Sequence, residues 1–367
     1  MRIMLVSSGG YQYLAPVIPA MERLGATFEN IGLDPLLGPP PKWVPRAVRR
    51  YYFDKASIAR YRERIEAFRP DLIHVTGIRH LLMKTIVALR PHDSVALVYE
   101  RISTGGLNVL NPIDPILFKH PRIDRFVVPA KATINNWMGG RYSRGLVRRD
   151  RMEPLHYALH VPPPTSPEEK RAMRMRLGLD ADAFIVGTVA YVRPIKQVEL
   201  AAEAVRTARS DRPLVMAVVG GEAAKPAYAA KVRAAGGDRL KMLGVIPEAH
   251  RIMPVFDLYV SPTAVPGESF GMAFAEAMSH GVPAFTMNYG ASAEICDHGH
   301  TGYALPESVS VWRRHIEELV ADPEKWARMG AAARARIAER FSPDARAADY
   351  WRVYSTAIEE RRSGRSG

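Results

Sequence analysis

Short apolar runs alternate with helix-length segments along the whole chain. The run Leu214–Val219 is continuously apolar, which is typical of strands buried on both faces of a parallel sheet. Strands separated by helix-length segments predict βαβ units, and therefore an α/β fold with doubly wound parallel sheets. The candidate strands are residues 2–8, 28–33, 72–76, 95–100, 125–129, 154–158, 184–191, 214–220, 240–245, 258–262, 283–287 and 302–305.

A cluster of prolines at residues 162–164 interrupts this alternation near the middle of the chain. Proline-rich segments act as semi-rigid spacers, and the strand pattern restarts at Phe184. We therefore predict two Rossmann-like domains that face a cleft, an N-terminal domain of residues 1–161 and a C-terminal domain of residues 162–342. A helix at residues 343–362 is expected to pack back on the N-terminal domain.

The composition is that of a soluble globular protein, and it does not indicate what the protein binds. No apolar run reaches the roughly 18 residues of a membrane-spanning helix. Cys296 is the only cysteine, which excludes an internal disulfide and favours a reducing cytoplasm. Residues 1–160 carry 24 Lys and Arg against 13 Asp and Glu, whereas the rest of the chain carries 27 against 25. This asymmetry fits a basic, solvated surface or contact with an acidic partner.

The segment from Thr263 to Phe285 lies between two candidate strands and contains one short helix, which Gly281 and Pro283 end. The first turn of that helix exposes free backbone N–H groups at the carboxyl end of a parallel strand, where open α/β sheets bind phosphates. Glu268 precedes the helix and Glu276 lies inside it, and both carboxylates can accept hydrogen bonds from hydroxyls. The predicted phosphate-binding residues are Ser269, Phe270, Gly271 and Met272.

These residues resemble the Glu-x₇-Glu motif of the retaining GT-B glycosyltransferases, particularly glycosyltransferase family 4 (glycosyl transferases group 1). The similar stretches are ESFGMAFAEAMSHGVPAF and the following GASAEICDHGHTGYAL. The resemblance implies the GT-B architecture and transfer of a hexose from a nucleotide-diphosphate donor (UDP or GDP), with retention at the anomeric carbon. It also implies that Glu276 binds the ribose and that Glu268 binds hydroxyls of the donor sugar.

A second match, FIVGTVAYVRPIK, precedes this one. It implies that Arg193 and Lys196 clamp the donor diphosphate, although the glycine that usually precedes this arginine is not in its place. Further likeness to the family implies base contacts at Val245 and Ile246. In the N-terminal half, Gly9 and Gly10 take the position of the family's glycine loop, which faces the donor phosphates and the reacting sugar.

The end of the strand at residues 95–100 departs from the family pattern. Many members carry a histidine there, near the donor sugar, whereas this chain carries Glu100 and Arg101. Glu100 is our candidate for a catalytic role at that place, and the identity of the sugar stays open. His74, on the neighbouring strand, is predicted to be a packed residue.

The basic, aromatic segment of residues 41–68 has two equal interpretations. Arginines interleaved with Trp43 and Tyr51 suit an anionic membrane surface, and the resembled family has many lipid-linked acceptors, among them cell-envelope glycans. The alternative is a solvated helix with its aromatic residues in the core. We expect no nucleic-acid partner, because no recognition motif accompanies the charge. The predicted location is cytoplasmic, peripheral to the inner membrane if this segment binds lipid.

Neither a metal nor a cofactor besides the nucleotide sugar is predicted. Asp180 and Asp182 stand in a turn rather than a metal motif, and no His or Cys cluster has ligand spacing. Two alternatives of the same fold remain, a sugar-nucleotide epimerase and a catalytically silent, membrane-associated binding protein. A dehydrogenase is disfavoured because no Gly-x-Gly-x-x-Gly follows the first strand.

Overall fold

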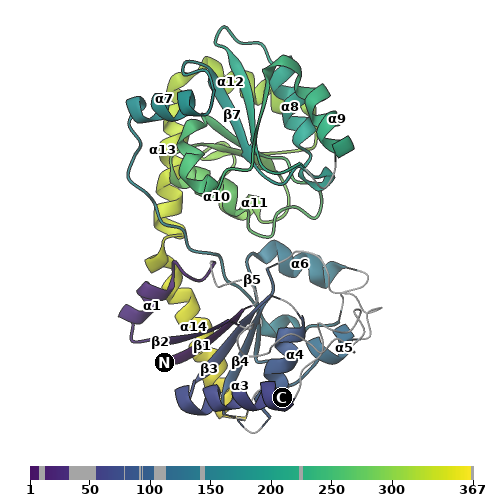
Figure 1. Ribbon diagram of the computed structural model, residues 1–367, viewed down its shortest axis with the longest axis vertical. Coiled ribbons are helices and arrows are strands. Elements are labelled where there is room, and N and C mark those ends of the chain that lie inside the picture. The colour runs from purple at the N-terminus through teal and green to yellow at the C-terminus, as the bar shows by residue number, and fades with distance from the viewer. Residues whose placement is uncertain are drawn as a thin grey trace. The chain divides into compact units, whose positions relative to one another are not determined.

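The structure is a computed structural model that describes residues 1–7, 13–32, 55–77, 79–90, 92, 94–102, 113–140, 145–222 and 226–364. The chain forms two compact units, Met1–Ala158 with Pro343–Gly367, and Leu159–Ser342. Within the described residues, each unit is built on a six-stranded parallel sheet flanked by helices (Figure 1). This confirms the predicted α/β class with two doubly wound sheets.

The first unit has the strand order β2-β1-β3-β4-β5-β6. Its strands are β1 (Arg2–Ser7), β2 (Thr27–Gly32), β3 (Leu72–Thr76), β4 (Ala96–Glu100), β5 (Arg125–Val128) and β6 (Met152–Pro154). Its helices are α1 (Ile18–Arg23), α3 (Lys55–Phe68), α4 (Arg79–Ala88), α5 (Ile113–Phe118), α6 (Lys131–Gly139), η2 (Arg149–Arg151) and α14 (Pro343–Arg362). The last strand ends at Pro154, so the strand predicted at residues 154–158 begins two residues earlier than expected and is shorter.

The second unit has the strand order β12-β11-β10-β7-β8-β9. Its strands are β7 (Phe184–Val189), β8 (Leu214–Val219), β9 (Leu240–Gly244), β10 (Leu258–Ser261), β11 (Ala284–Met287) and β12 (Gly302–Leu305). Its helices are α7 (Pro167–Arg176), η3 (Pro194–Lys196), α8 (Val198–Thr207), α9 (Pro226–Gly236), η4 (Gly237–Arg239), η5 (Ala249–Val255), α10 (Met272–Ser279), α11 (Ser292–Ile295), α12 (Val309–Ala321) and α13 (Pro323–Arg340).

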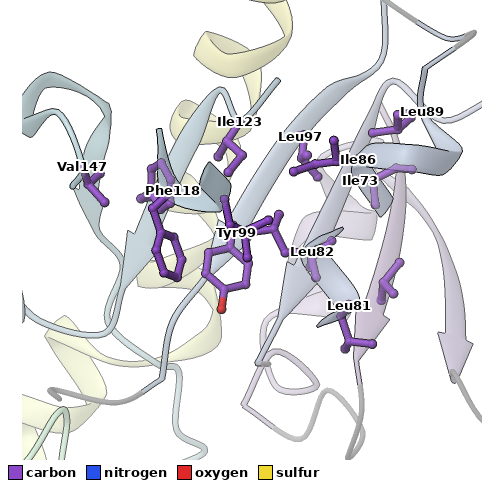
Figure 2. Close-up of a cluster of buried hydrophobic side chains, with 14 of the residues drawn as sticks. Ile73, Leu81, Leu82, Ile86, Leu89, Leu97, Tyr99, Phe118, Ile123 and Val147 are labelled. Carbon is purple, nitrogen blue, oxygen red and sulfur yellow. The ribbon is translucent and has the colours of Figure 1, made fainter. Parts of the chain in front are cut away.

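The core of the first unit lies on both faces of its sheet, as expected of strands that are apolar on both sides. One face packs against α3, α4 and α5, with Leu82, Tyr99 and Phe118 at its centre (Figure 2). The Tyr99 hydroxyl donates to the carbonyl of Gly77 at 2.7 Å, so this buried ring is satisfied. The other face packs against α1 and α14.

Helix α14 returns from the end of the chain to the first unit and completes its core. It buries Ala347, Tyr350, Val353, Tyr354, Ala357 and Ile358 beside α1 and the strands β3 and β4. At its C-terminal end, Arg361 Nε donates to Asp124 Oδ1 at 2.9 Å. Asp124 also accepts the Leu97 amide at 2.7 Å, so α14 is tied to the sheet through a buried carboxylate.

In the second unit, a buried carboxylate joins α7 to the sheet. Asp257, which precedes β10, accepts from Lys170 at 2.8 Å, from Arg174 at 2.6 Å and from the Ile185 amide at 2.8 Å. A buried charge is tolerated when it is paired and hydrogen-bonded, and this one is paired twice. The start of the unit is therefore fixed to its central strands.

The described part of the basic segment matches the interpretation as a core-packed helix. In α3, the buried Tyr61 hydroxyl lies 3.1 Å from the Thr85 hydroxyl, and Arg62 donates to the carbonyls of Val87 and Ala88 at the end of α4. Residues 41–54, with Trp43 and Tyr51, lie outside the described residues. Among the helices that the structure describes, none is long and apolar enough to cross a bilayer.

Candidate active site

The strand order of the second unit predicts where a ligand binds. From β7 the chain proceeds to β8 and β9 on one side, and it then crosses to β10 on the other side of β7. Open α/β sheets bind ligands outside the carboxyl ends of strands at such a switch point. The loop after β7 carries Arg193 and Lys196, and the loop after β10 carries Thr263 and Glu268. Residues that are 72 positions apart therefore meet.

An ion pair joins these two loops. Lys196 Nζ lies 2.5 Å from Glu268 Oε1, and the Thr263 hydroxyl donates to the same oxygen at 2.6 Å. The side chains of Lys196 and Glu268 are 22% and 19% exposed, so the pair is shielded but reachable. The Ala264 amide donates to the Ile195 carbonyl at 2.8 Å, which holds the backbones of the two loops together. The structure thus brings two of the predicted site residues into contact.

Arg193 is placed differently from Lys196. It is exposed, and its guanidinium carbon lies 5.9 Å from the ring centroid of the exposed Tyr191. Within the described residues no carboxylate pairs with Arg193, so its charge faces solvent beside an aromatic ring. A guanidinium in this state is suited to bidentate binding of phosphate oxygens.

The first turn of α10 forms the next part of the site. Gly271 is its N-cap, with φ of 95° and no side-chain cap, so the first backbone N–H groups of the helix lack that partner. A Cβ on Gly271 would lie 1.9 Å from the Phe274 ring, which explains why glycine stands there. Ser269 and Met272 are half-buried.

Phe270 contributes to this turn in a way that the sequence did not indicate. Its side chain is fully buried and packs against Phe341 with ring centroids 5.9 Å apart. A donor contact predicted for Phe270 is therefore restricted to its main chain. The aromatic pair anchors the residues between Glu268 and Gly271 to the end of α13.

Glu276 lies on α10, in the second turn after Gly271. Desolvation by burial raises the pKa of its carboxyl from its usual value of 4.5 to about 7. No hydrogen bond or ion pair to this carboxylate occurs within the part of the chain that the structure describes. A half-buried acid without a partner is a candidate for ligand binding.

The predicted base-contact residues follow β9. Val245 is exposed and Ile246 is half-buried. Val245 and Tyr191 both lie beside Gly221, where a Cβ would be 3.4 Å from Val245 and 3.8 Å from Tyr191. Ile195 and Val265 are also exposed, and they stand on the loops after β7 and β10. Exposed apolar side chains on these loops are available to pack against a ligand.

The first amide of α8 has a side-chain partner from α9. The Val198 amide donates to the Tyr228 hydroxyl at 3.0 Å, and that hydroxyl donates to Glu199. The Val198 amide is therefore already paired within the protein. The sequence offered no sign of this cap, because Tyr228 lies 30 residues away.

In the first unit, Glu100 is at the carboxyl end of β4 and is fully buried. Its Oε2 accepts from the Thr76 hydroxyl at 2.9 Å and lies 3.3 Å from His74 Nε2. His74 Nδ1 in turn lies 2.6 Å from the Tyr354 hydroxyl on α14, so His74 is packed, as predicted. Direct contact between Glu100 and a donor sugar would require the surrounding residues to move. Gly9 and Gly10 lie outside the described residues.

Burial and the nearby Glu100 carboxylate define the chemistry of this interior cluster. Both raise the pKa of Tyr157, Tyr350 and Tyr354 well above 10, so the three phenols stay protonated. Among the described residues, no group of three or more His, Cys, Asp and Glu side chains is arranged to hold a metal ion.

Residues 169–336, which include the switch point, the Lys196–Glu268 pair and α10, match the family described as "Glycosyl transferases group 1". Residues 169–336 are therefore similar to a glycosyltransferase domain of this group. The prediction of such a domain, drawn from Glu268, Glu276, Arg193 and Lys196, is confirmed at this level.

Two of the relatives that the chain matches carry the same enzyme name. The chain is 31% identical over 207 residues to D-inositol 3-phosphate glycosyltransferase of Thermobispora bispora, covering 53% of this chain and 48% of the relative. It is 28% identical over 229 residues to the enzyme of that name from Streptomyces scabiei, covering 58% and 50%. The chain thus matches about half the length of these relatives.

Solved structures share the fold over nearly the full chain. HepE from Anabaena, in complex with UDP and glucose, aligns with a TM-score of 0.73 at 18% identity and covers 97% of this chain and 100% of HepE. A glycosyltransferase from Rickettsia africae aligns with a TM-score of 0.76 at 13% identity, covering 98% of both chains. At these identities the likeness shows the fold, which is that of the GT-B glycosyltransferases, as predicted.

Proposed function

We propose that this protein transfers a sugar from a nucleotide-diphosphate donor to an acceptor hydroxyl, with retention at the anomeric carbon and without a metal ion. The observation that carries the proposal is the Lys196–Glu268 pair, 2.5 Å apart, at the switch point of a matched glycosyltransferase domain. The pair consists of an ammonium, which can bind phosphate, and a carboxylate, which can accept hydrogen bonds from sugar hydroxyls, at the switch point of the sheet.

The donor extends across this site in our proposal. Lys196, Arg193 and the N–H groups of Gly271 and Met272 receive the diphosphate, whose charge increases as it leaves. Glu276 accepts from the ribose, and Glu268 accepts from the sugar hydroxyls. Val245 and Ile246 pack on the base. A uridine or guanosine nucleotide is proposed, and the HepE structures with UDP and UDP-glucose support uridine.

The chemistry is front-face displacement, in which the leaving diphosphate takes the acceptor proton. In this mechanism the chain supplies orientation and charge stabilisation rather than a covalent nucleophile. In this proposal Lys196 faces the leaving diphosphate. Its Glu268 partner keeps the ammonium in place before the donor arrives, so little reorganisation is needed.

The acceptor is proposed to be a polyhydroxylated molecule with an anionic group. The relatives are named for inositol 3-phosphate, and residues 1–160 of this chain carry 24 basic against 13 acidic side chains. Electrostatic steering by such a surface favours a phosphorylated acceptor. A lipid-linked phosphate has the same chemistry, and residues 41–68 are proposed to touch an anionic membrane in that case.

A thermal-shift screen against nucleotide sugars tests the donor class. A donor at about a hundred times its dissociation constant stabilises the folded protein by about 2.7 kcal/mol. NMR of the first product with inositol phosphates as acceptors then tests the reaction. An inverted linkage contradicts retention, and epimerised donor without acceptor favours an epimerase. If no nucleotide sugar raises the melting temperature, the whole proposal is contradicted.

Vesicle co-sedimentation tests the membrane contact separately. Binding to vesicles with phosphatidylserine, but not to neutral phosphatidylcholine vesicles, is expected if residues 41–68 contact lipid. Reversal of charge at Arg49 and Arg50 should then abolish binding, whereas Arg171→Glu on exposed α7 should not. Equal binding to neutral vesicles would exclude the electrostatic contact.

A further inference from the structure

Hydrogen bonds hold both the carboxylate and the main chain of Glu268. Its Oε1 accepts both from Lys196 at 2.5 Å and from Thr263 at 2.6 Å. Its carbonyl accepts the Ala291 amide at 3.0 Å. The preceding Gly267 has φ of 82°, and a Cβ there would lie 3.0 Å from the Cα of Gly290. Backbone and carboxylate are therefore both fixed.

Thr263 differs from the other donor to this carboxylate. It is 5% exposed, and within the described residues the other hydrogen-bond partner of its hydroxyl is Ser261 Oγ at 3.5 Å. Lys196 is a flexible point charge that follows a carboxylate in many orientations, whereas a buried β-branched side chain is restricted at χ1. Of the two donors, Thr263 therefore restricts the orientation of the carboxylate more strongly.

Saturation of Oε1 leaves Oε2 for an external donor. An ionised carboxylate oxygen accepts about two hydrogen bonds, and Oε1 has two. No described residue donates to Oε2. With the carboxylate fixed in this orientation, an incoming sugar finds a single free acceptor oxygen, Oε2, that points in one direction.

We propose that Thr263 is a positioning residue that makes the site selective for one hydroxyl of the donor sugar. The inference rests on the proposed function, in which Glu268 accepts from that sugar. A site built to hydrogen-bond a hydroxyl strongly rejects an analogue that lacks it, provided that the acceptor cannot rotate to another group. Thr263 prevents that rotation, and it acts through Glu268 without contact to the sugar.

Two substitutions separate the hydroxyl from the shape of the side chain. Thr263→Val keeps the volume and removes the hydrogen bond, and Thr263→Ser keeps the hydrogen bond. Ser261→Ala is the matched control, because it removes a neighbouring hydroxyl that does not touch Glu268. Crystal structures of the four proteins without a donor give the first readout. We expect Glu268 to rotate or to adopt two conformers in Thr263→Val alone, and an unmoved carboxylate there overturns the proposal.

Kinetics give the second readout. The ratio of kcat/KM between the cognate donor and the same donor lacking one sugar hydroxyl should fall about tenfold in Thr263→Val, the size of one charge-assisted hydrogen bond. In Thr263→Ser this ratio should equal that of the wild-type protein, because the hydrogen bond to Glu268 is kept. Affinity for the nucleoside diphosphate without sugar should stay within about twofold, since Glu268 accepts from the sugar and Lys196 binds the diphosphate in the proposed function.

The outcomes distinguish this inference from the proposed function. An unchanged ratio in Thr263→Val, or a parallel loss of nucleoside-diphosphate affinity, overturns the positioning role while the transferase assignment stands. If the wild-type protein uses no nucleotide sugar, the proposed function fails. The crystal structures still decide in that case whether Thr263 orients Glu268.

Discussion

Glu276 shows how burial alone can prepare a residue for ligand binding. Desolvation raises its pKa to about 7, and an acid whose folded pKa is above its unfolded value stabilises the protein less as pH rises. The folded chain holds the extra proton between pH 4.5 and 7, so the penalty for ionising Glu276 is absent at low pH and complete above 7.

We expect Glu276→Gln to remove this penalty. Relative to wild type, its free energy of unfolding should rise by about 1–3 kcal/mol between pH 5 and pH 8 without ligand. Urea unfolding at both pH values measures this. The control is Glu324→Gln, an exposed acid at the start of α13. If wild type and Glu276→Gln differ equally at both pH values, Glu276 does not titrate near 7.

Lys196 is the residue on which turnover should depend most. If it stabilises the leaving diphosphate, Lys196→Ala lowers kcat by roughly 10²–10³, in the range seen when one preorganised charge-stabilising donor is removed. Lys231→Ala is the matched control, because Lys231 also pairs with a glutamate, at 2.9 Å, but on exposed α9. Steady-state kinetics with the donor found in the screen measure kcat for both variants. A near-normal kcat in Lys196→Ala would show that Lys196 does not stabilise the leaving group.

Among the elements, α10 depends on one glycine for the geometry of its first turn. Gly271→Ala meets two obstacles, a φ of 95° and the Phe274 ring 1.9 Å from the new Cβ. Gly178→Ala meets only the first, with φ of 67° and open space around it. We expect Gly178→Ala to destabilise the protein by about 1 kcal/mol and Gly271→Ala by about 2–4 kcal/mol.

Only the change at Gly271 should also weaken donor binding, since it displaces the N–H groups that receive the phosphates. Chemical denaturation and calorimetric titration with the nucleoside diphosphate measure the two effects. Equal destabilisation by both substitutions would mean that the Phe274 ring moves aside without loss.

The same elements show how far the sequence reaches. The strands, the helix after Gly271 and the neighbouring Glu268 could be predicted, because each depends on local periodicity and on residues within one loop. The Tyr228 cap on α8 and the Tyr354–His74 contact could not, since their partners are 30 and 280 residues apart. Glu100 illustrates the limit most clearly: a strand buried on both faces has no polar alternation to show that its last side chain turns inward.

Thr263 is a residue whose proximity to Glu268 the sequence could predict, but whose contact with the carboxylate it could not. It follows Pro262 in the motif and precedes Glu268 by five residues, so a hydroxyl near the acid could have been expected. That its oxygen, rather than the loop backbone, holds the carboxylate depends on the χ angles of both residues, which a sequence does not specify.

At the scale of the whole molecule, each unit has its own hydrophobic core, and part of the core of the first unit is formed by residues of α14. Helix α14 buries four large side chains in it, Tyr350, Val353, Tyr354 and Ile358. At about 1.5–3 kcal/mol for each buried side chain, their sum is comparable with the roughly 5–15 kcal/mol that stabilise a whole domain. The first unit should therefore not fold without α14.

Deletion of residues 343–367 tests this dependence. Hydrogen-exchange mass spectrometry should show that peptides of β3 and β4 lose protection, while peptides of β7 and β10 keep theirs, because among the described residues the core around β7 and β10 contains none from α14. Tyr354→Phe, which removes only the 2.6 Å contact with His74, should lower stability by about 1–2 kcal/mol and leave both sheets protected. Wild-type protection of β3 and β4 in the deletion variant would show that the first unit folds on its own and that α14 is an accessory to it.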